Sequence, residues 1–422
     1  MDIGTLSLLL LIGLFVLLAM GMPLGFASAA LAGAVLLMKF GPDLLFRDFG
    51  RGPFAVLGQA IYRQMTNYVL ISVPLFIFMA ALLERSGIAK DMYSSLNVWL
   101  SRTRGGIAIV TSVMAVIMAA MSGIIGGEVV LLGLIALPQM LRLGYNQNLA
   151  IGTICASGSL GTMIPPSIVL IFYGLITETS IKALFTASFL PGLMLASFFI
   201  IYIVIRTQLN PEQAPLPEPD PDDPEGREKL ALFGAFLTVM VMGATALLLV
   251  RAVFQTVTGG NAVLEGVDPI PLGMVTHIPY FLGILVVGAL ALQFGFGRER
   301  VLTGWAMGKG LVAPIVVIGV VLGSIYGGIT GITEAAAMGV IAVFLISLAR
   351  GEMSFDVVWD SLMRTMKSTG TIIWVTIGAA ALAAAYTLVG GPTYVANLII
   401  GAELPTMGVI LLMRLIFLIM GM

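Results

Sequence analysis

Cys155-Ala156-Ser157-Gly158-Ser159-Leu160-Gly161-Thr162-Met163-Ile164-Pro165-Pro166-Ser167 interrupts an otherwise apolar run that extends over residues 149–176. Proline has no N–H group to donate and its ring clashes with the preceding turn, so Pro165 and Pro166 predict a break in a helix. In lipid such a break leaves unpaired carbonyls, and it is tolerated only inside protein or beside a water-filled cavity. Secondary transporters build substrate and ion sites from broken helices near the middle of the bilayer. The stretch therefore predicts a membrane protein that moves a solute.

The composition of the chain independently indicates a membrane protein. Hydrophobic residues make up 59% of the 422 residues and charged residues only 10%, whereas soluble domains carry about 25% charged residues. A net charge of −1 gives no electrostatic basis for binding nucleic acid. The single cysteine excludes an internal disulfide and a cysteine-based metal cluster, and the single histidine excludes zinc sites that need two histidines. We therefore expect a protein that is not an enzyme.

Apolar runs along the chain predict several membrane-spanning helices, each of which needs roughly 20 residues. Some runs are shorter or are interrupted by glycine and proline, which favours hairpins and discontinuous helices over a regular bundle. We predict an all-α, polytopic integral membrane protein. Its first part should contain a helical hairpin at about residues 105–143 and a broken helix at 148–177.

A polar, acidic and proline-rich segment at residues 207–229 predicts an extended linker. Asp220, Asp222 and Asp223 suggest a metal site as an alternative, but enzymes that use such aspartates hold them on helices, which the proline density prevents. The linker separates a first half, residues 1–206, from a second half, residues 230–422.

The two halves have a similar order of elements, which predicts inverted repeats of the kind found in transporters. Each half contains a short amphipathic segment, at residues 88–100 and 355–366. Segments with one apolar and one charged face tend to lie in the membrane interface. We expect these two helices to brace the protein there.

Several motifs occur in the order expected of one transporter family. They are Val73-Pro74-Leu75-Phe76-Ile77-Phe78-Met79, Glu84-Arg85-Ser86-Gly87-Ile88-Ala89, Ser122-Gly123, Gly144-Tyr145, Ile164-Pro165-Pro166-Ser167 and Thr333-Glu334-Ala335-Ala336-Ala337. In their joint order and spacing the chain resembles the large membrane subunit (DctM-like) of tripartite ATP-independent periplasmic (TRAP) transporters. The segments 122–126 and 250–300 resemble the branch associated with mannitol, chloroaromatic and 2-oxo acid substrates.

This resemblance implies an elevator-type importer, in which a hairpin-bearing transport domain slides against a scaffold. Sodium (Na+) entry would be coupled to the uptake of an organic acid anion such as a carboxylate or 2-oxo acid. The implied partners are a small four-helix membrane subunit, a periplasmic substrate-binding protein and membrane lipid, in the bacterial inner membrane. No organic cofactor is implied. An elevator-type symporter or antiporter that works without a binding protein is the alternative, and coupling to protons instead of sodium also stays open.

The chain departs from the family pattern at three places. The common Ser-Gly-Ser hairpin tip is here Ser122-Gly123-Ile124, so one hydroxyl ligand is missing, and Gly331-Ile332 replaces the usual Thr-Pro before the Thr-Glu-Ala-Ala motif. The sequence stops at Gly421-Met422, where the family's second hairpin turns. By the spacing of the first half, roughly 80 further residues are expected. We expect either a fragment or a remainder that is supplied elsewhere.

Small polar residues at the hairpin tip and at the helix break are the candidate sodium ligands. Hydroxyls and unwound backbone carbonyls supply the oxygen atoms that sodium prefers without burying a charge. The candidates are Ser122, Gly123, Ser157, Gly158, Gly161 and Thr162. The alternative is that these small residues only let helices pack closely. The proline break favours the ion site.

The candidate substrate residues are Pro165, Pro166, Glu128, Glu334 and Arg414. A charge at the bilayer centre costs about 2.5–3.5 kcal/mol on insertion scales, so Glu128 should be paired, protonated, functional or placed in a wet hairpin mouth. Glu334 either caps the helix that follows it or belongs to the site. Arg414 would hold a substrate carboxylate bidentately if it faces the cavity, and would otherwise have to snorkel towards the membrane surface.

Overall fold

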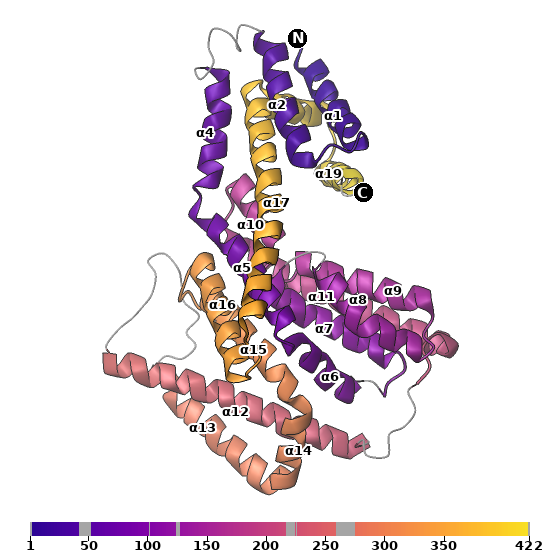
Figure 1. Ribbon diagram of the computed structural model, residues 1–422, viewed down its shortest axis with the longest axis vertical. Helices are drawn as coiled ribbons and strands as arrows, with labels where there is room; N and C mark the ends of the chain where they lie inside the picture. Colours follow the sequence, from indigo (N-terminus) through magenta and orange to yellow (C-terminus); the bar gives the residue numbers. More distant parts are fainter. Residues whose placement is uncertain are drawn as a thin grey trace. The chain divides into compact units, whose positions relative to one another are not determined.

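The computed structural model describes residues 2–41, 52–100, 102–123, 127–216, 224, 226–258 and 275–420. All regular structure within these residues is helical, which confirms the predicted all-α class (Figure 1). Contacts divide the chain into two compact units, Met1–Leu70 with Lys367–Met422, and Ile71–Met366. We describe each unit by itself.

Seven helices within the described residues are long and apolar enough to cross a membrane. They are Tyr68–Arg85, Ile181–Leu209, Gly226–Phe254, Ile278–Phe296, Arg298–Tyr326, Ile332–Ala349 and Phe355–Leu388. The most apolar stretch of Tyr68–Arg85 is 56% buried inside the structure, whereas in four of the others only 11–17% is buried. Exposed apolar surface on this scale is stable only against lipid or another protein. The prediction of a polytopic membrane protein is therefore confirmed.

The first unit is built around an antiparallel pair of helices, α1 (Ile3–Ala19) and α2 (Leu24–Phe40). Gly21 has a φ of +83°, which glycine adopts at little cost, and it lets the chain turn between the two helices. The second part of α17 (Phe355–Leu388) packs against α2, where Gly25 and Gly378 bring the two backbones into contact. The core of this unit consists of Leu10, Leu31, Ala32, Val35, Leu36, Ala381, Ala385 and Val389. Its other helices are α4 (Pro53–Met65), α18 (Gly391–Gly401) and α19 (Thr406–Met420).

The second unit contains the hairpin and the broken helix. The hairpin is formed by α7 (Gly106–Ser122) and α8 (Gly127–Arg142), and both of its helices pack against α9 (Gln147–Gly158). The short 3-10 helix η2 (Ser159–Thr162) and then α10 (Ile168–Thr177) follow α9, and α11 (Ile181–Leu209) lies beside α7 and α9 (Figure 1). These elements lie at the residues where the sequence predicts a hairpin and a broken helix.

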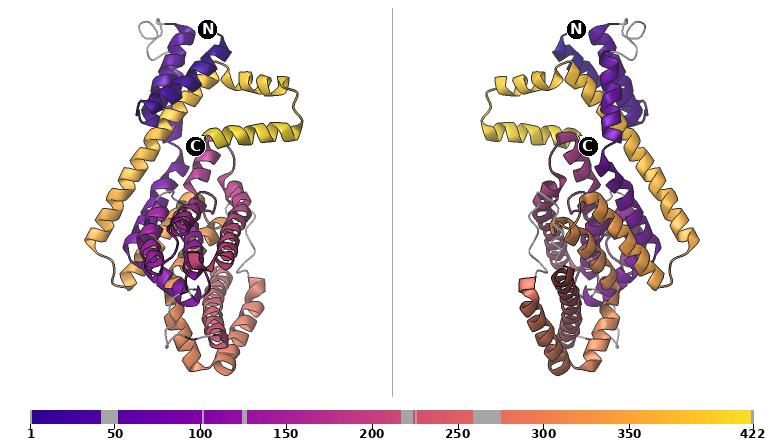
Figure 2. Two further views of the ribbon diagram at one scale, coloured as in Figure 1. Left: turned by 90° about the vertical axis from the view of Figure 1, so that its right-hand side faces the viewer. Right: turned by 90° about the vertical axis from the view of Figure 1, so that its left-hand side faces the viewer.

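Two further groups of helices complete this unit. The helix α5 (Ser72–Arg85) packs against α16 (Ile332–Ala349), which pairs with α15 (Val312–Tyr326), and α6 (Ile88–Leu100) lies against α7. The long α12 (Gly226–Thr258) packs against α13 (Ile278–Leu290) and α14 (Arg298–Gly308), as Figure 2 shows in salmon and orange. Short turns of helix lie at Tyr68–Ile71, Pro211–Gln213, Val275–His277, Ala291–Phe296 and Lys309–Leu311.

The predicted linker and amphipathic segments have a different extent in the structure. The helix α11 continues to Leu209 and α12 begins at Gly226, so helical structure enters both ends of the predicted linker 207–229. Asp220, Asp222 and Asp223 lie outside the described residues. The segment 88–100 forms α6, whereas 355–366 is the beginning of the continuous 34-residue helix α17. The division of the chain into repeat halves stays a prediction.

Candidate functional site

The helix break is closed by hydrogen bonds from its own residues and from the hairpin tip. After η2 the chain is non-helical until α10 begins at Ile168, which leaves backbone groups without helical partners. The backbone N–H of Ile168 donates to the carbonyl oxygen of Gly123 at 3.2 Å. The hydroxyl of Ser167 donates to the carbonyl oxygen of Thr162 at 2.8 Å. One hydrogen bond thus joins the hairpin tip to the break, and another closes the break itself.

Gly123 makes this contact possible. It follows the last residue of α7 and has a φ of +58°, in the left-handed region that favours glycine. A Cβ atom at this position would overlap the carbonyl oxygen of Pro166. The backbone of the tip thus lies directly against the proline pair, which is buried.

The carboxyl group of Glu128 lies at the centre of this arrangement. Glu128 is in the first turn of α8 and only 2% exposed. Its Oε1 accepts a hydrogen bond from the hydroxyl of Ser122, and its Oε2 is buried with no hydrogen-bond partner. A Cβ atom on Gly161 would come within 2.8 Å of Oε2, so η2 closes the third side of the carboxyl group. The hairpin and the broken helix thus bring together Ser122, Glu128 and Gly161.

The carboxyl group of Glu128 has no positively charged partner within the described residues. The guanidinium of Arg364 lies close to the neighbouring Gly127. Arg364 Nη1 instead pairs with Glu84 Oε2 at 2.7 Å. An isolated buried carboxylate is strongly unfavourable unless it is paired, coordinates a cation or is neutralised. The site is therefore suited to hold one positive charge.

Of three other candidate sodium ligands, Ser157 and Gly158 make contacts between helices and Thr162 makes a local hydrogen bond. The hydroxyl of Ser157 is fully buried and shares a hydrogen bond of 2.9 Å with the hydroxyl of Ser112 in α7. Gly158 lies against Val129 of α8, where a Cβ atom would overlap the valine side chain. The hydroxyl of Thr162 donates to the carbonyl oxygen of Ser159 at 2.8 Å. A role of these residues in sodium binding stays a prediction.

Glu334 and Arg414 lie elsewhere in the structure. Glu334 is exposed in the first turn of α16, and a Cβ atom on the capping residue Gly331 would come within 2.6 Å of its Oε2. The carboxylate therefore folds back over the positive end of the helix, a position that the helix dipole favours. Arg414 is exposed on α19, in the other unit. Neither position tests the predicted substrate role.

Several residues at the site were not identified from the sequence. The contacts of Ser112 and of the Glu84–Arg364 ion pair depend on which helices pack together. The periodicity of the sequence does not predict helix packing. Ser167 directly follows the proline pair, so its hydroxyl could have been recognised as a partner for a carbonyl freed by the break.

The family model of the tripartite ATP-independent periplasmic transporter, DctM component, matches residues 11–422. The chain belongs to the DctM family. It is 32% identical over 218 residues to the C4-dicarboxylate TRAP transporter large permease protein DctM of Pseudomonas aeruginosa, which covers 51% of this chain and 48% of that protein. The ectoine TRAP transporter large permease protein TeaC of Halomonas elongata is 33% identical over 201 residues, which cover 48% of this chain and 44% of that protein.

The sialic acid TRAP transporter large permease protein SiaM of Vibrio cholerae is 28% identical over 190 residues, or 44% of this chain and 42% of that protein. This DctM-family chain thus matches about half the length of each relative. These relatives are named as permease proteins and not as enzymes, in agreement with the prediction. Family membership and the apolar helices together confirm a multi-pass protein of the inner membrane. The branch predicted from the sequence stays a prediction.

Proposed function

We propose that this chain is the large permease subunit of a TRAP transporter that couples sodium entry to the uptake of an organic acid anion. Membership of the DctM family supports the transporter class. The names of the relatives, which include C4-dicarboxylate and sialic acid transporters, support an organic acid as the substrate.

The observation that carries the proposal is the buried carboxyl group of Glu128 between the hairpin and the broken helix. The Oε2 atom of Glu128 has no hydrogen-bond partner, and its Oε1 atom accepts a hydrogen bond from the Ser122 hydroxyl. Gly161 lies beside this carboxyl group and has no side chain to cover the backbone there. Oxygen ligands of this kind suit a hard cation such as sodium. Ser122 and Glu128 are the side chains that would hold the ion.

The charge of Glu128 also provides a mechanism of coupling. Without a cation, the buried carboxylate disfavours the packing of the hairpin tip against the break, because its charge is desolvated and unpaired. A bound cation offsets that cost, so it favours the closed arrangement. A ligand shifts a conformational equilibrium only by its differential affinity for the two states. The sodium-loaded transport domain would therefore be the form that moves against the scaffold.

The proposed partners are the small four-helix membrane subunit and a periplasmic binding protein that delivers the substrate. Four apolar helices with little burial offer the surface that a membrane subunit and lipid would cover. Arg414 is the proposed contact for a substrate carboxylate, because guanidinium groups bind carboxylates bidentately. The substrate branch of mannitol, chloroaromatic or 2-oxo acids is part of this proposal.

Reconstitution into liposomes tests the proposal. The chain, the small subunit and the binding protein are combined, and uptake of a labelled dicarboxylate is measured with an inward sodium gradient. Uptake should require both the gradient and the binding protein. A potassium gradient of equal size serves as the control. Sodium-driven uptake that persists without the binding protein would favour the alternative of a binding-protein-independent symporter.

A further inference from the structure

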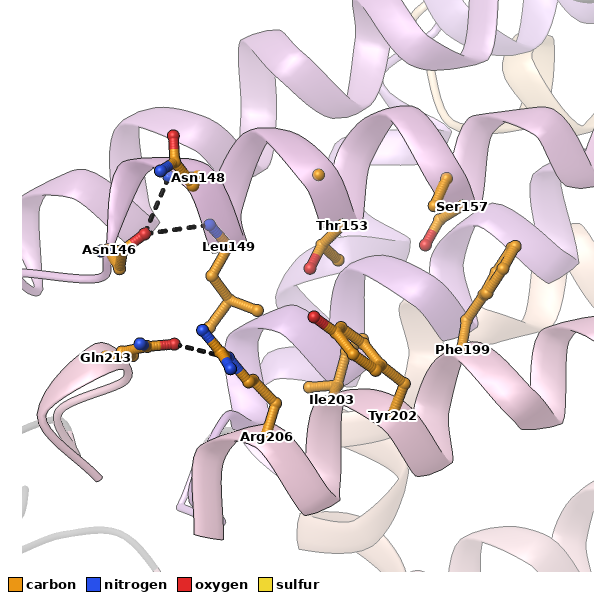
Figure 3. Close-up of a pocket in the computed structure, with 12 residues that line it drawn as sticks. Asn146, Asn148, Leu149, Thr153, Ser157, Phe199, Tyr202, Ile203, Arg206 and Gln213 are labelled. Atoms are coloured by element: carbon orange, nitrogen blue, oxygen red, sulfur yellow. Dashed lines mark hydrogen bonds between the residues drawn. The ribbon is translucent and has the colours of Figure 1, made fainter. Parts of the chain in front are cut away.

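A groove of about 440 Å³ lies between α9 and α11, away from the hairpin tip (Figure 3). Figure 3 shows Asn148, Arg206 and Gln213 at one end of the groove and Phe199 at the other. The helix α11 belongs to an apolar membrane-spanning segment, and Arg206 lies in its last turn. The end of the groove at Arg206 is therefore at the level of the membrane surface.

The groove is charged at one end and uncharged along the rest of its length. Its mouth is lined by Arg206 and Asn148. Gly152, Ala156 and Phe199 line the part beyond the mouth, together with the hydroxyl-bearing Thr153 and Ser157. From Asn148 to Ala156 the helix rises about 12 Å. The hydroxyl of Tyr202 lies between the two ends, a level that tyrosine favours in membrane proteins. One charged end and uncharged walls beyond it match a phospholipid, whose charged headgroup lies above uncharged chains.

The mouth of the groove has one charged lining residue, Arg206. Arg206 donates one hydrogen bond, from Nε to Gln213 Oε1 at 3.0 Å, and forms no ion pair within the described residues. The backbone of Arg104 lies beside it, because the Thr207 hydroxyl donates to the Arg104 carbonyl oxygen at 3.3 Å. Arg142 ends the neighbouring α8, and Arg104, Arg142 and Arg206 are all exposed. Clusters of arginine at the ends of membrane helices indicate the cytoplasmic side, where anionic lipids are abundant.

We propose that this groove binds one anionic phospholipid. Its phosphate would accept hydrogen bonds from the Arg206 guanidinium, and the first part of an acyl chain would lie along Gly152 and Ala156. The Asn146 side chain already accepts hydrogen bonds from the N–H groups of Asn148 and Leu149. The positive charge for the headgroup therefore comes from arginine and not from the end of α9.

Lipid retention measures this binding directly. The purified chain is exposed to mixed micelles that contain phosphatidylglycerol or phosphatidylcholine with the same acyl chains, and mass spectrometry of the intact protein counts the retained lipids. One phosphatidylglycerol should be retained, about fivefold in preference to phosphatidylcholine, as expected for one basic residue near an anionic lipid. Arg206→Gln should remove this preference, and Arg298→Gln, which changes an exposed arginine of α14, should not. Equal preference in the wild type and Arg206→Gln would overturn the proposal.

A second variant tests the apolar part of the groove. Gly152 is exposed and has open space where a Cβ atom would lie, so Gly152→Leu fills the groove without a clash. This variant should lose the retained lipid while its melting temperature stays the same or rises, because leucine favours helix over glycine. Gly319→Leu, at an exposed glycine of α15 that also has open space, is the matched control. Retained lipid in Gly152→Leu would contradict binding in this groove. Displacement of the lipid by inorganic phosphate would also contradict the proposal and would indicate a soluble anion as the ligand.

Discussion

The hydroxyl of Ser122 donates to Oε1 of Glu128 and so links the two helices of the hairpin. Ser122 ends α7 and Glu128 lies in the first turn of α8, so this one bond ties the two helices together at their tip. The second carboxyl oxygen has no partner and lies against η2. One carboxyl oxygen thus holds the two helices together, and the other has no hydrogen-bond partner.

Glu128→Gln should remove the sodium dependence of stability. In choline the variant should be more stable than the wild type by about 1–3 kcal/mol, because it no longer buries an unpaired acid. Sodium should raise the melting temperature of the wild type only, since a ligand that binds the folded state stabilises it. Thermal unfolding in sodium and in choline at equal ionic strength measures both effects. Glu299→Gln, at an exposed position of α14, is the control and should respond to sodium as the wild type does.

Gly123→Ala should separate the hairpin tip from the helix break. The left-handed backbone costs a non-glycine residue about 1–2 kcal/mol, and the overlap with the Pro166 oxygen adds about 1–3 kcal/mol. Uptake should fall to background. Gly21→Ala is the matched control, because Gly21 also has a positive φ but has open space around it. Melting temperatures that fall equally in the two variants would show that the contact with Pro166 contributes nothing.

Two ion pairs join α5 to the beginning of α17, and they should contribute unequally. Glu84 and Arg364 are 19% and 36% exposed, whereas Arg85 and Asp360 are 46% and 52% exposed. Solvent screening weakens exposed pairs to about 0.5 kcal/mol or less. A double-mutant cycle for Glu84→Gln and Arg364→Gln should give about 1 kcal/mol, the upper end for such pairs and more than the cycle for Arg85 and Asp360. Equal coupling energies would contradict this order.

Arg414→Asn should weaken carboxylate uptake selectively. Loss of a charge-assisted pair should reduce the apparent affinity for an organic acid anion about tenfold, whereas a neutral analogue should be affected little. Competition assays in proteoliposomes compare the two ligands. A similar loss for both ligands would exclude a role of Arg414 in binding the carboxylate.

The hairpin and the broken helix could be predicted because their signals are local. Pro165 and Pro166 break a helix wherever they occur, and the apolar runs before them have the length of two helices. The closeness of Ser122 and Glu128 was not predicted, although both were candidates, because it depends on how the end of α7 meets the beginning of α8. Their contact with Gly161 depends in addition on how η2 packs against the hairpin.

The sequence did not identify contacts between distant segments. Ser112 and Ser157 are both small polar residues in apolar helices, and nothing in either helix indicates that they face each other. The continuity of α17 was also missed, since the change from an amphipathic to an apolar pattern near Lys367 suggests two elements. One continuous helix whose surroundings change along its length produces the same change of hydrophobic pattern as two separate helices.

The length of α17 has a consequence for how it fits the bilayer. Residues 368–388 carry no charge and rise about 30 Å, which equals the thickness of the hydrocarbon core. The charged turns before them, with Asp360 and Arg364, therefore extend into the headgroup layer. A bilayer thicker or thinner than this apolar part would have to tilt the helix or move its charged turns. Membrane thickness would then act on the ion pairs that these turns form with α5.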